Sequence, residues 1–408
     1  MELKLTSERG PNNHLEELAE LAKTAGADVV NEIVQIKDSP CASTYIGKGK
    51  AYELKEEAER VQADIIIFNN NLTGSQARNI EDIVNAKIID RTELILDIFA
   101  QRARTREAKL QVELAQLKYS LPRLTGKGVA LSRLGGGIGT RGPGETKLEY
   151  DRRRIRNRIT HLKKEMQRIV KERKQQRAKR KEFVVCSLVG YTNAGKSTLL
   201  NTFTSAGVRT EDRLFATLDP TTRGFILPNN QKILLVDTVG FIQNLPHDLV
   251  SSFAATLEEV QKADALLHVV DTSSPWMDKQ IDAVNEVLKQ LDVISKPILI
   301  VLNKIDRFED DKLVRRMLKR IPNSVAISAL YNRGLERLFA AMMDLPPLRL
   351  RHFSVAIPAN NGRLYTWLKR EGNIESCRYE GDRFIIDVGL TDKKMAYFKK
   401  LRSNAPTG

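Results

Sequence analysis

In the first hundred residues, segments whose apolar residues recur at helical spacing alternate with short extended segments. Apolar residues at helical spacing predict helices over 15–25, 51–63 and 75–84. Extended segments are predicted at 28–36, 65–68 and 87–90, the last two being short apolar runs that are typical of buried strands. Helices that alternate with short strands indicate a small α/β layer fold with parallel strands.

Two further segments carry an apolar stripe at helical spacing. In the first, 107–121, leucines recur at steps of four, three and four residues, and Pro122 ends the helix. In the second, the stripe consists of Ile155, Ile159, Leu162, Met166 and Ile169. We expect the two stripes to pack together as an antiparallel helical hairpin. The joining segment, 134–146, is too rich in glycine to form a regular element, since ordering glycine costs more entropy than ordering other residues.

Beyond residue 182 the chain again predicts buried strands, followed by a smaller terminal region. The strands are expected at 183–189, 233–236, 297–302 and 325–327. From residue 351 the pattern predicts strand, helix, strand, strand and helix, with a core around Trp367, Ile385 and Phe398. The predicted fold is α/β and multi-domain, ending in a small α+β domain. Its boundaries are placed at 1–105, 106–181, 182–347 and 348–408.

The segment that joins the strand at 183–189 to the next helix has the composition of a phosphate-binding loop. Its sequence, G-Y-T-N-A-G-K-S, matches G-x-x-x-x-G-K-[ST] at every fixed position. Glycines allow backbone N–H groups to surround a phosphate chain at the start of a helix. Lys196 is expected to reach the β and γ phosphates, and the Ser197 hydroxyl to bind Mg²⁺. The segment predicts binding of a nucleoside triphosphate.

A second motif decides which base is bound. The apolar run 297–302 ends in Asn303, Lys304, Ile305 and Asp306, the pattern N-K-x-D. The Asp306 carboxylate can accept hydrogen bonds from N1 and N2 of guanine, whereas adenine would leave it unpaired. Asn303 is expected to brace the loop and Lys304 to lie along the base. A backbone N–H from Ser328, Ala329 or Leu330 can donate to guanine O6. The third domain is therefore predicted to be a P-loop GTPase domain.

A D-x-x-G element and a threonine-rich segment complete the predicted site. Asp237 follows a buried strand and is expected to hold Mg²⁺, while the Gly240 N–H senses the γ-phosphate. Between the two motifs, three threonines compete as the switch residue that completes the Mg²⁺ shell, namely Thr217, Thr221 and Thr222.

Phe241 follows the D-x-x-G element, where Ras-like GTPases carry a glutamine that orients the attacking water. Because phenylalanine cannot orient water, we expect slow intrinsic hydrolysis. Asn193 is expected either to brace the loop or to help a K⁺ ion stabilise developing charge. His247 is a titratable neighbour that we expect to be structural.

Composition points to a polyanionic partner. The 408 residues carry a formal net charge of +15, with a pI near 9.6. No run of eighteen apolar residues predicts a membrane span, and the three scattered cysteines predict neither metal site nor disulfide, as expected for a cytoplasmic protein. About half of residues 152–181 are Lys or Arg, which favours RNA. The candidate RNA contacts are Arg141, Gly142, Arg152, Arg153 and Arg154.

Together with F-A-T-L-D-P-T-T-R and the segment G-G-G-I-G-T-R-G-P-G-E-T, these motifs resemble the HflX family of translational GTPases over residues 44–345. The resemblance implies GTP hydrolysis to GDP, Mg²⁺ as cofactor, and Thr217 as the switch threonine. It also implies binding to the large (50S) ribosomal subunit and the splitting or rescue of stalled ribosomes. We further expect the basic helices to contact ribosomal RNA and the protein to be a monomer. The alternative is a regulatory or ribosome-assembly GTPase that binds RNA without splitting ribosomes.

The predicted residues fall into three sets. Lys196, Thr217 and Gly240 are expected to act in catalysis, and Ser197, Thr217 and Asp237 to bind the metal. The nucleotide is expected to contact Gly190, Tyr191, Thr192, Asn193, Ala194, Gly195, Lys196, Ser197, Thr198, Phe215, Ala216, Thr217, Leu218, Asp219, Asp237, Thr238, Val239, Gly240, Asn303, Lys304, Asp306, Ser328, Ala329 and Leu330.

Overall fold

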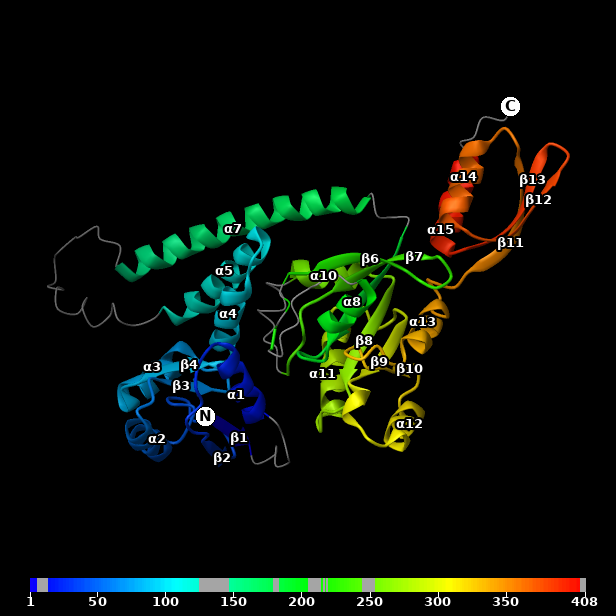
Figure 1. Cartoon of the computed structure of the whole chain (residues 1–408). Helices are drawn as coiled ribbons and strands as arrows, with labels where there is room; N and C mark the ends of the chain where they lie inside the picture. The colour runs from blue at the N-terminus through cyan, green and yellow to red at the C-terminus, as the bar shows by residue number, and fades with distance from the viewer. Residues whose placement is uncertain are drawn as a thin grey trace. The chain divides into compact units, whose positions relative to one another are not determined.

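The computed structural model describes residues 1–5, 14–124, 147–178, 183–204, 214–215, 217, 219–243 and 254–403 (Figure 1). These residues form two compact units, the first ending at Val170 and the second beginning at Lys171. Each unit is described by itself. The α/β class expected from the sequence is confirmed in both.

The first unit opens with parallel strands and helices in alternation. Strand β1 (Glu2–Leu5) pairs with β2 (Val34–Lys37), and β3 (Ile65–Phe68) pairs with β4 (Lys87–Asp90), both in parallel. The helices are α1 (His14–Thr24), α2 (Lys48–Val61) and α3 (Gly74–Val84). The extended segment predicted at 28–36 is a strand only from Val34, because its partner β1 begins at Glu2, which lies opposite Val34.

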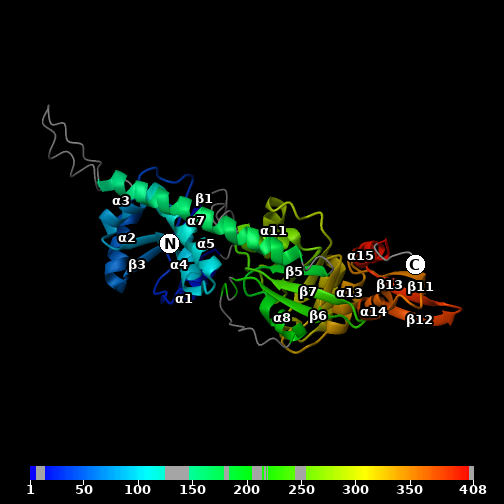
Figure 2. The same ribbon diagram turned by 90° about the horizontal axis from the view of Figure 1, so that it is seen from above.

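The predicted helical hairpin is present, and the first unit contains its first helix and the second helix as far as Val170. Helices α4 (Arg91–Arg102) and α5 (Arg106–Ser120) lead to α7 (Lys147–Ala178), which runs beside α5 (Figure 2). The two apolar stripes form one cluster, with Leu110, Leu114, Ile159 and Leu162 buried at its centre. Ion pairs Arg158–Glu113 (2.7 Å) and Arg106–Glu165 (3.6 Å) join the helices in antiparallel order. We call this α5–α7 hairpin the arm.

A buried carboxylate ties the arm to the strand layer. Asp90, at the end of β4, caps α4 by accepting from Glu93 N (3.0 Å). It also accepts from the Tyr119 hydroxyl (2.6 Å) and from the Arg123 guanidinium (2.9 Å), both near the end of α5. A Cβ on Gly74 would come within 2.9 Å of Arg123 Cα, so this close approach requires glycine at α3. The arm is thereby fixed at its root.

The second unit contains a six-stranded sheet in the order β10-β9-β8-β5-β7-β6. Its strands are β5 (Val184–Gly190), β6 (Thr221–Ile226), β7 (Lys232–Asp237), β8 (Ala265–Asp271), β9 (Ile298–Asn303) and β10 (Ser324–Ala326). All neighbours are parallel except β6 and β7. Because parallel strands end at one edge, the loops that follow β5, β7 and β9 gather there.

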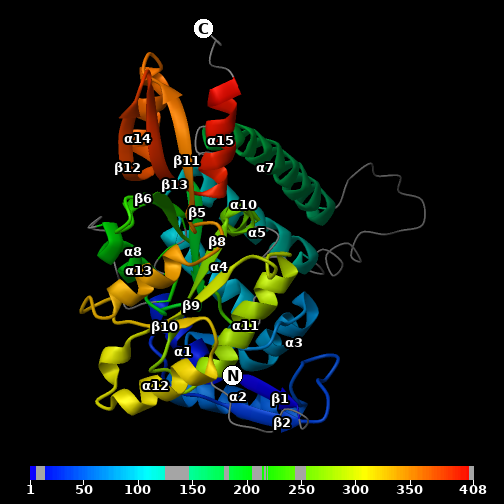
Figure 3. The same ribbon diagram turned by 90° about the vertical axis from the view of Figure 1, so that its right-hand side faces the viewer.

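Helices cover both faces of this sheet, so its strands are apolar on both sides. Helices α8 (Lys196–Thr204) and α13 (Leu335–Met343) pack on one face (Figure 3). Helices α11 (Met277–Gln290) and α12 (Asp311–Arg320) contribute to a cluster on the other face. Helix α10 (Ala254–Lys262) precedes β8.

The terminal region folds in the predicted order, around a slightly different core. Strands β11 (Arg351–Pro358), β12 (Asn373–Glu380) and β13 (Arg383–Leu390) form an antiparallel sheet with β13 in the middle. Helices α14 (Gly362–Glu371) and α15 (Asp392–Ser403) cover one face. Trp367 and Phe398 are buried as expected, but the prediction of Ile385 is wrong, because strand side chains alternate and Ile386 is the one that faces the helices.

This alternation can be tested by truncation. Ile386→Ala should lower the free energy of unfolding by about 2–5 kcal/mol, because it leaves a cavity in a filled core. Ile385→Ala, one residue earlier on the other face, should cost less than about 1.5 kcal/mol. Urea unfolding followed by tryptophan fluorescence measures both, since Trp367 lies in this core. Equal losses in the two variants would contradict the assigned face.

Candidate functional site

The loop between β5 and α8 depends on two glycines. Gly190 has φ +152° and Gly195 has φ +94°, a region that favours glycine. A Cβ on Gly190 would lie 2.2 Å from Val269 O, and one on Gly195 would lie 2.3 Å from Asn303 Nδ2. The loop therefore packs against the ends of β8 and β9 through bare backbone. Side chains at these positions would push it out of place.

Lys196, the first residue of α8, is buried inside this loop. Its Nζ donates to Gly190 O (3.1 Å) and to Tyr191 O (2.8 Å). Desolvation lowers the pKa of Lys196 to about 8, against an opposing effect of the Asp237 charge. A buried ammonium is stabilised by an anion. The phosphate chain of a nucleotide supplies that charge where the loop would bind it.

Ser197, Thr217 and Asp237 converge beside Lys196. Ser197 Oγ lies 2.7 Å from Asp237 Oδ2, and Thr217 Oγ1 lies 2.8 Å from Ser197 Oγ and 3.1 Å from Asp237 Oδ2. Of the three competing threonines, the structure brings Thr217 to this cluster, whereas Thr221 and Thr222 begin strand β6.

The cluster fits a divalent cation. Asp237 Oδ1 is buried and accepts no hydrogen bond from the residues that the structure describes. Desolvation raises the pKa of Asp237, and the Lys196 charge and the hydrogen bonds from Ser197 and Thr217 offset this effect only in part. Two hydroxyls and a carboxylate are oxygen ligands of the kind that Mg²⁺ prefers.

The D-x-x-G turn is joined to the phosphate loop by backbone hydrogen bonds. Phe241 N donates to Gly190 O (3.1 Å), and Thr192 N donates to Phe241 O (2.8 Å). A Cβ on Gly240 would lie 2.8 Å from Thr192 Cα and 3.0 Å from Lys196 Nζ. The Phe241 side chain is buried, so it does not face the phosphate positions as a polar group would. These contacts hold the turn against the loop.

The N-K-x-D segment braces the loop from the end of β9. Asn303 Nδ2 donates to Ala194 O (2.9 Å), and its Oδ1 accepts from Ala329 N (3.0 Å). Lys304 forms an ion pair with Asp271 (2.8 Å). Asp306 lies in the 3-10 helix Ile305–Arg307 and is half-buried. These contacts place the segment beside the phosphate loop, while its hydrogen bonds to guanine stay a prediction.

The other predicted residues differ in solvent exposure and in backbone conformation. Asn193 is exposed with φ +59°, and Phe215 has a buried side chain with φ +56°. Asp219 is half-buried, as is Arg152 on α7, whereas Arg153 and Arg154 are exposed there. Thr238, Val239 and Ser328 are buried, Thr198 is half-buried and Leu330 is exposed. Five further residues lie outside the described residues, namely Arg141, Gly142, Ala216, Leu218 and His247.

Sequence reasoning missed Asp271 and His268 at this site, and it expected Tyr191 only as a nucleotide contact. Asp271 pairs with Lys304 at the end of β8, and the signal was available, because it ends an apolar strand as Asp237 does. The Tyr191 hydroxyl accepts from Gln243 N (2.8 Å) and so secures the segment after the D-x-x-G turn. His268 is buried on β8, and desolvation followed by the Lys196 charge lowers its pKa to about 4. The last two follow from tertiary packing alone.

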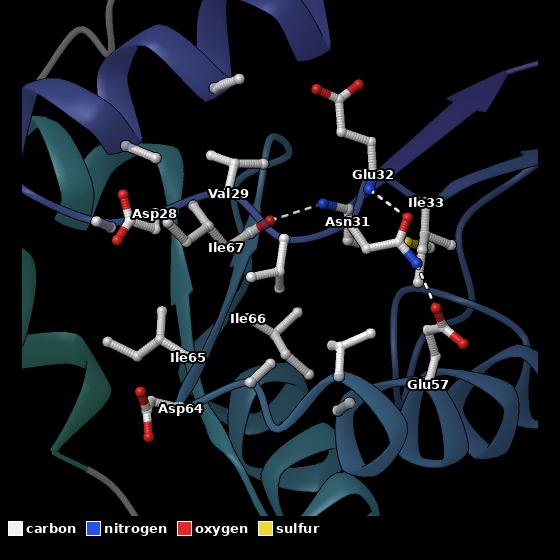
Figure 4. A pocket seen from close by; sticks show the side chains of 18 of the residues that line it. Asp28, Val29, Asn31, Glu32, Ile33, Glu57, Asp64, Ile65, Ile66 and Ile67 are labelled. Carbon is white, nitrogen blue, oxygen red and sulfur yellow. Dashed lines mark hydrogen bonds between the residues drawn. The ribbon is translucent and has the colours of Figure 1, made fainter.

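The first unit contains a separate cavity of about 500 Å³ (Figure 4). Apolar side chains from α1, α2 and β3 form much of its lining. The charged side chains among its lining residues are the carboxylates Asp28, Glu32, Glu57 and Asp64, and none of the lining residues is Lys or Arg. A phosphate chain would be repelled by these carboxylates. The geometry therefore favours the β5–α8 loop as the nucleotide site.

Comparison with known proteins identifies the family. Family models described as "GTP-binding GTPase N-terminal", "GTP-binding GTPase Middle Region" and "50S ribosome-binding GTPase" match residues 12–100, 102–180 and 185–304. The "GTPase HflX" of Caldanaerobacter subterraneus subsp. tengcongensis is 51% identical over 366 residues, covering 88% of this chain and 83% of the relative. The chain belongs to the HflX family of GTPases. It is a GTP-binding protein and a GTP hydrolase.

A second curated relative agrees with this assignment. The HflX GTPase of Escherichia coli K12 is 42% identical over 374 residues, covering 88% of each chain. A solved GTP-binding protein from Sulfolobus solfataricus in complex with GDP is 28% identical, with a TM-score of 0.42, and covers 84% of this chain and 97% of that chain. Among the described helices of this HflX protein, none is long and apolar enough to cross a membrane.

Lys196 should make GTP binding pH-dependent. Its pKa near 8 in the free protein is raised by bound phosphates, so above pH 8 binding requires uptake of a proton and affinity falls. Calorimetry at pH 8, in two buffers of different ionisation heat, should show uptake of about half a proton. Lys196→Arg should remove the uptake, since guanidinium stays protonated. Binding by the parent protein without proton uptake would contradict the assignment.

Guanine specificity should rest on Asp306. Asp306→Asn removes a charge-assisted acceptor, which should weaken GTP binding by about 1.5–3 kcal/mol, or roughly tenfold or more. Xanthosine triphosphate provides the control, because its C2 carbonyl can accept from the new amide, and its affinity should rise. Fluorescence titration of both nucleotides measures the change. If the variant binds GTP as tightly as the parent, the base lies elsewhere.

Proposed function

We propose that this HflX GTPase binds the large (50S) ribosomal subunit when GTP is bound, and splits or rescues stalled ribosomes. The match of residues 185–304 to the family described as "50S ribosome-binding GTPase" supports the partner. The arm supports the contact with ribosomal RNA. This activity would place the protein in the cytoplasm, where it acts as a monomer.

The arm is the observation that carries the RNA contact. Helix α7 contains thirteen Lys or Arg and four Asp or Glu. Its apolar stripe is occupied by α5, and Arg153, Arg154, Lys163 and Arg168 are exposed to solvent. Such a surface attracts a polyphosphate backbone. The network around Asp90 holds the arm at its root, as a device that exerts force requires.

GTP would control this activity through the residues around the phosphate loop. Lys196 would neutralise the β and γ phosphates, and Ser197, Thr217 and Asp237 would hold Mg²⁺, which supplies electrostatic stabilisation of the transferred phosphoryl group. Thr217 joins this cluster from the switch segment, so the γ-phosphate would fix its position. The Gly240 N–H would sense the same phosphate. Asn193, exposed at the loop, would stand beside a K⁺ ion.

The glycine-rich tip should separate binding from splitting. Deleting residues 135–144, which lie outside the described structure, should leave GTP hydrolysis in isolation unchanged, because the phosphate loop is not altered. Binding to 50S subunits should weaken modestly, since the basic face of α7 remains. Splitting of 70S particles should be lost. Sucrose-gradient sedimentation with GTP, GDP and a non-hydrolysable analogue measures both steps.

Two controls sharpen this test. Arg141→Ala with Gly142→Ala keeps the length of the tip and should reproduce the splitting defect. Lys196→Ala should abolish GTP-dependent binding altogether. If the deleted protein splits ribosomes as well as the parent, the arm is only an anchor. If the parent binds 50S subunits and splits no ribosomes, the protein is a regulatory or assembly GTPase.

A further inference from the structure

The two helices of the C-terminal domain carry a charge that its sheet does not share. Helices α14 and α15 together contain eight Lys or Arg and two Asp or Glu. On the sheet face that they leave uncovered, Arg378 lies 3.7 Å from Asp387, and His352 lies 2.7 Å from Glu375. Positive charge is therefore in excess on the two helices, which cover one face of the sheet.

Ring contacts show how the two helices are aligned. The Trp367 ring lies 5.7 Å from Tyr397 and 5.9 Å from Phe398, measured between ring centroids. Near the other end, Lys394 Nζ donates to Glu371 O (2.6 Å). The helices are thus antiparallel. One turn beyond the ring contacts, Arg363 at the start of α14 comes level with Arg402 at the end of α15.

Ion pairs neutralise the charge at one end of this helical pair. Lys394 is buried and pairs with Glu371 (3.3 Å), and Lys393 pairs with Asp264 of the GTPase domain (2.5 Å). The exposed acid of α15, Asp392, faces Arg351 (2.6 Å). The outward basic positions are Arg363, Lys369, Lys399, Lys400 and Arg402, all of them exposed. We call these five residues the α14–α15 basic surface.

We propose that the α14–α15 basic surface binds the phosphate backbone of double-helical RNA. Lys and Arg are the side chains that contact phosphates and position a protein on a duplex. Unpaired bases would call for exposed aromatic rings, but on these two helices Trp367 and Phe398 are buried and Tyr365 and Tyr397 are half-buried. Ribosomal RNA is the source of the duplex, and in this respect the inference rests on the proposed function. The surface is a second RNA contact, distinct from the arm.

Matched arginine pairs test this surface. Arg363→Gln with Arg402→Gln removes two charges from the helical side, and Arg378→Gln with Arg383→Gln removes two from the sheet face. Anisotropy titration of the full chain with a labelled 20-base-pair RNA duplex, at several KCl concentrations, measures both. The helix-side variant should bind about tenfold more weakly at about 100 mM KCl. The slope of log K against log salt should become less steep by about 2, one for each phosphate contact that is lost. The sheet-face variant should match the parent.

A background variant separates the two RNA contacts. Arg152→Gln with Arg153→Gln and Arg154→Gln weakens the arm, and the helix-side substitutions should cost the same factor there as in the parent. Unchanged duplex affinity in the helix-side variant, or an equal loss in the sheet-face variant, would overturn the proposal. The proposal would also be overturned if the helix-side variant lost binding to a polyglutamate peptide but kept its affinity for the duplex, because the partner would then be an acidic protein.

Failure of the proposed function gives a different result. A parent protein that binds the duplex through this surface but does not sediment with 50S subunits would contradict ribosome binding and leave the RNA surface in place. Thermal melting of both variants checks that the domain stays folded. Because all four arginines are exposed, neither pair should shift the melting temperature by more than about 2 °C.

Discussion

The structure of the GTPase domain depends on two opposite charges that are buried together. Lys196 and Asp237 lie at the carboxyl edge of the sheet, where desolvation disfavours the charged form of each. An isolated buried charge is costly, and these two compensate each other only in part, since one carboxylate oxygen of Asp237 finds no donor among the described residues. The ligands that remove this cost are an anionic phosphate chain and a cation. The fold thus accepts a desolvation penalty at these two charges, and the result is a site suited to a nucleotide and its metal.

Close approach of backbone segments holds these charges in place. The phosphate loop touches the ends of β8 and β9 at Gly190 and Gly195, and the D-x-x-G turn touches the loop at Gly240. Each contact is too tight for a Cβ atom. The loop, the turn and the segment after β9 are therefore held together as one assembly, and Thr217 contacts it through Ser197 and Asp237.

Outside the GTPase domain, charge is arranged on elements whose apolar sides are already covered. Helix α7 uses its stripe to pack on α5, and α14 and α15 use theirs to cover a three-stranded sheet. Basic residues then occupy the exposed sides of these helices, where their charged groups stay hydrated and folding carries no desolvation penalty. Asp90 at the root of the arm shows the contrasting case, because its carboxylate is buried and satisfied by four donors.

The sequence by itself determined the fold class, the antiparallel arm and the GTPase family. Helix and strand periods are local properties, and the phosphate-loop and N-K-x-D motifs place chemical groups at fixed spacing along the chain. The residues alone left Thr217, Thr221 and Thr222 as alternatives, which only the family resemblance narrowed, and the tertiary structure shows that Thr217 contacts Asp237, because this distance depends on the path of the chain through space. The tertiary structure also shows that Ile386, and not Ile385, belongs to the core, since neighbouring residues of a strand point to opposite faces. The roles of Tyr191 and Asp90 arise from contacts between residues far apart in sequence, which no local pattern encodes.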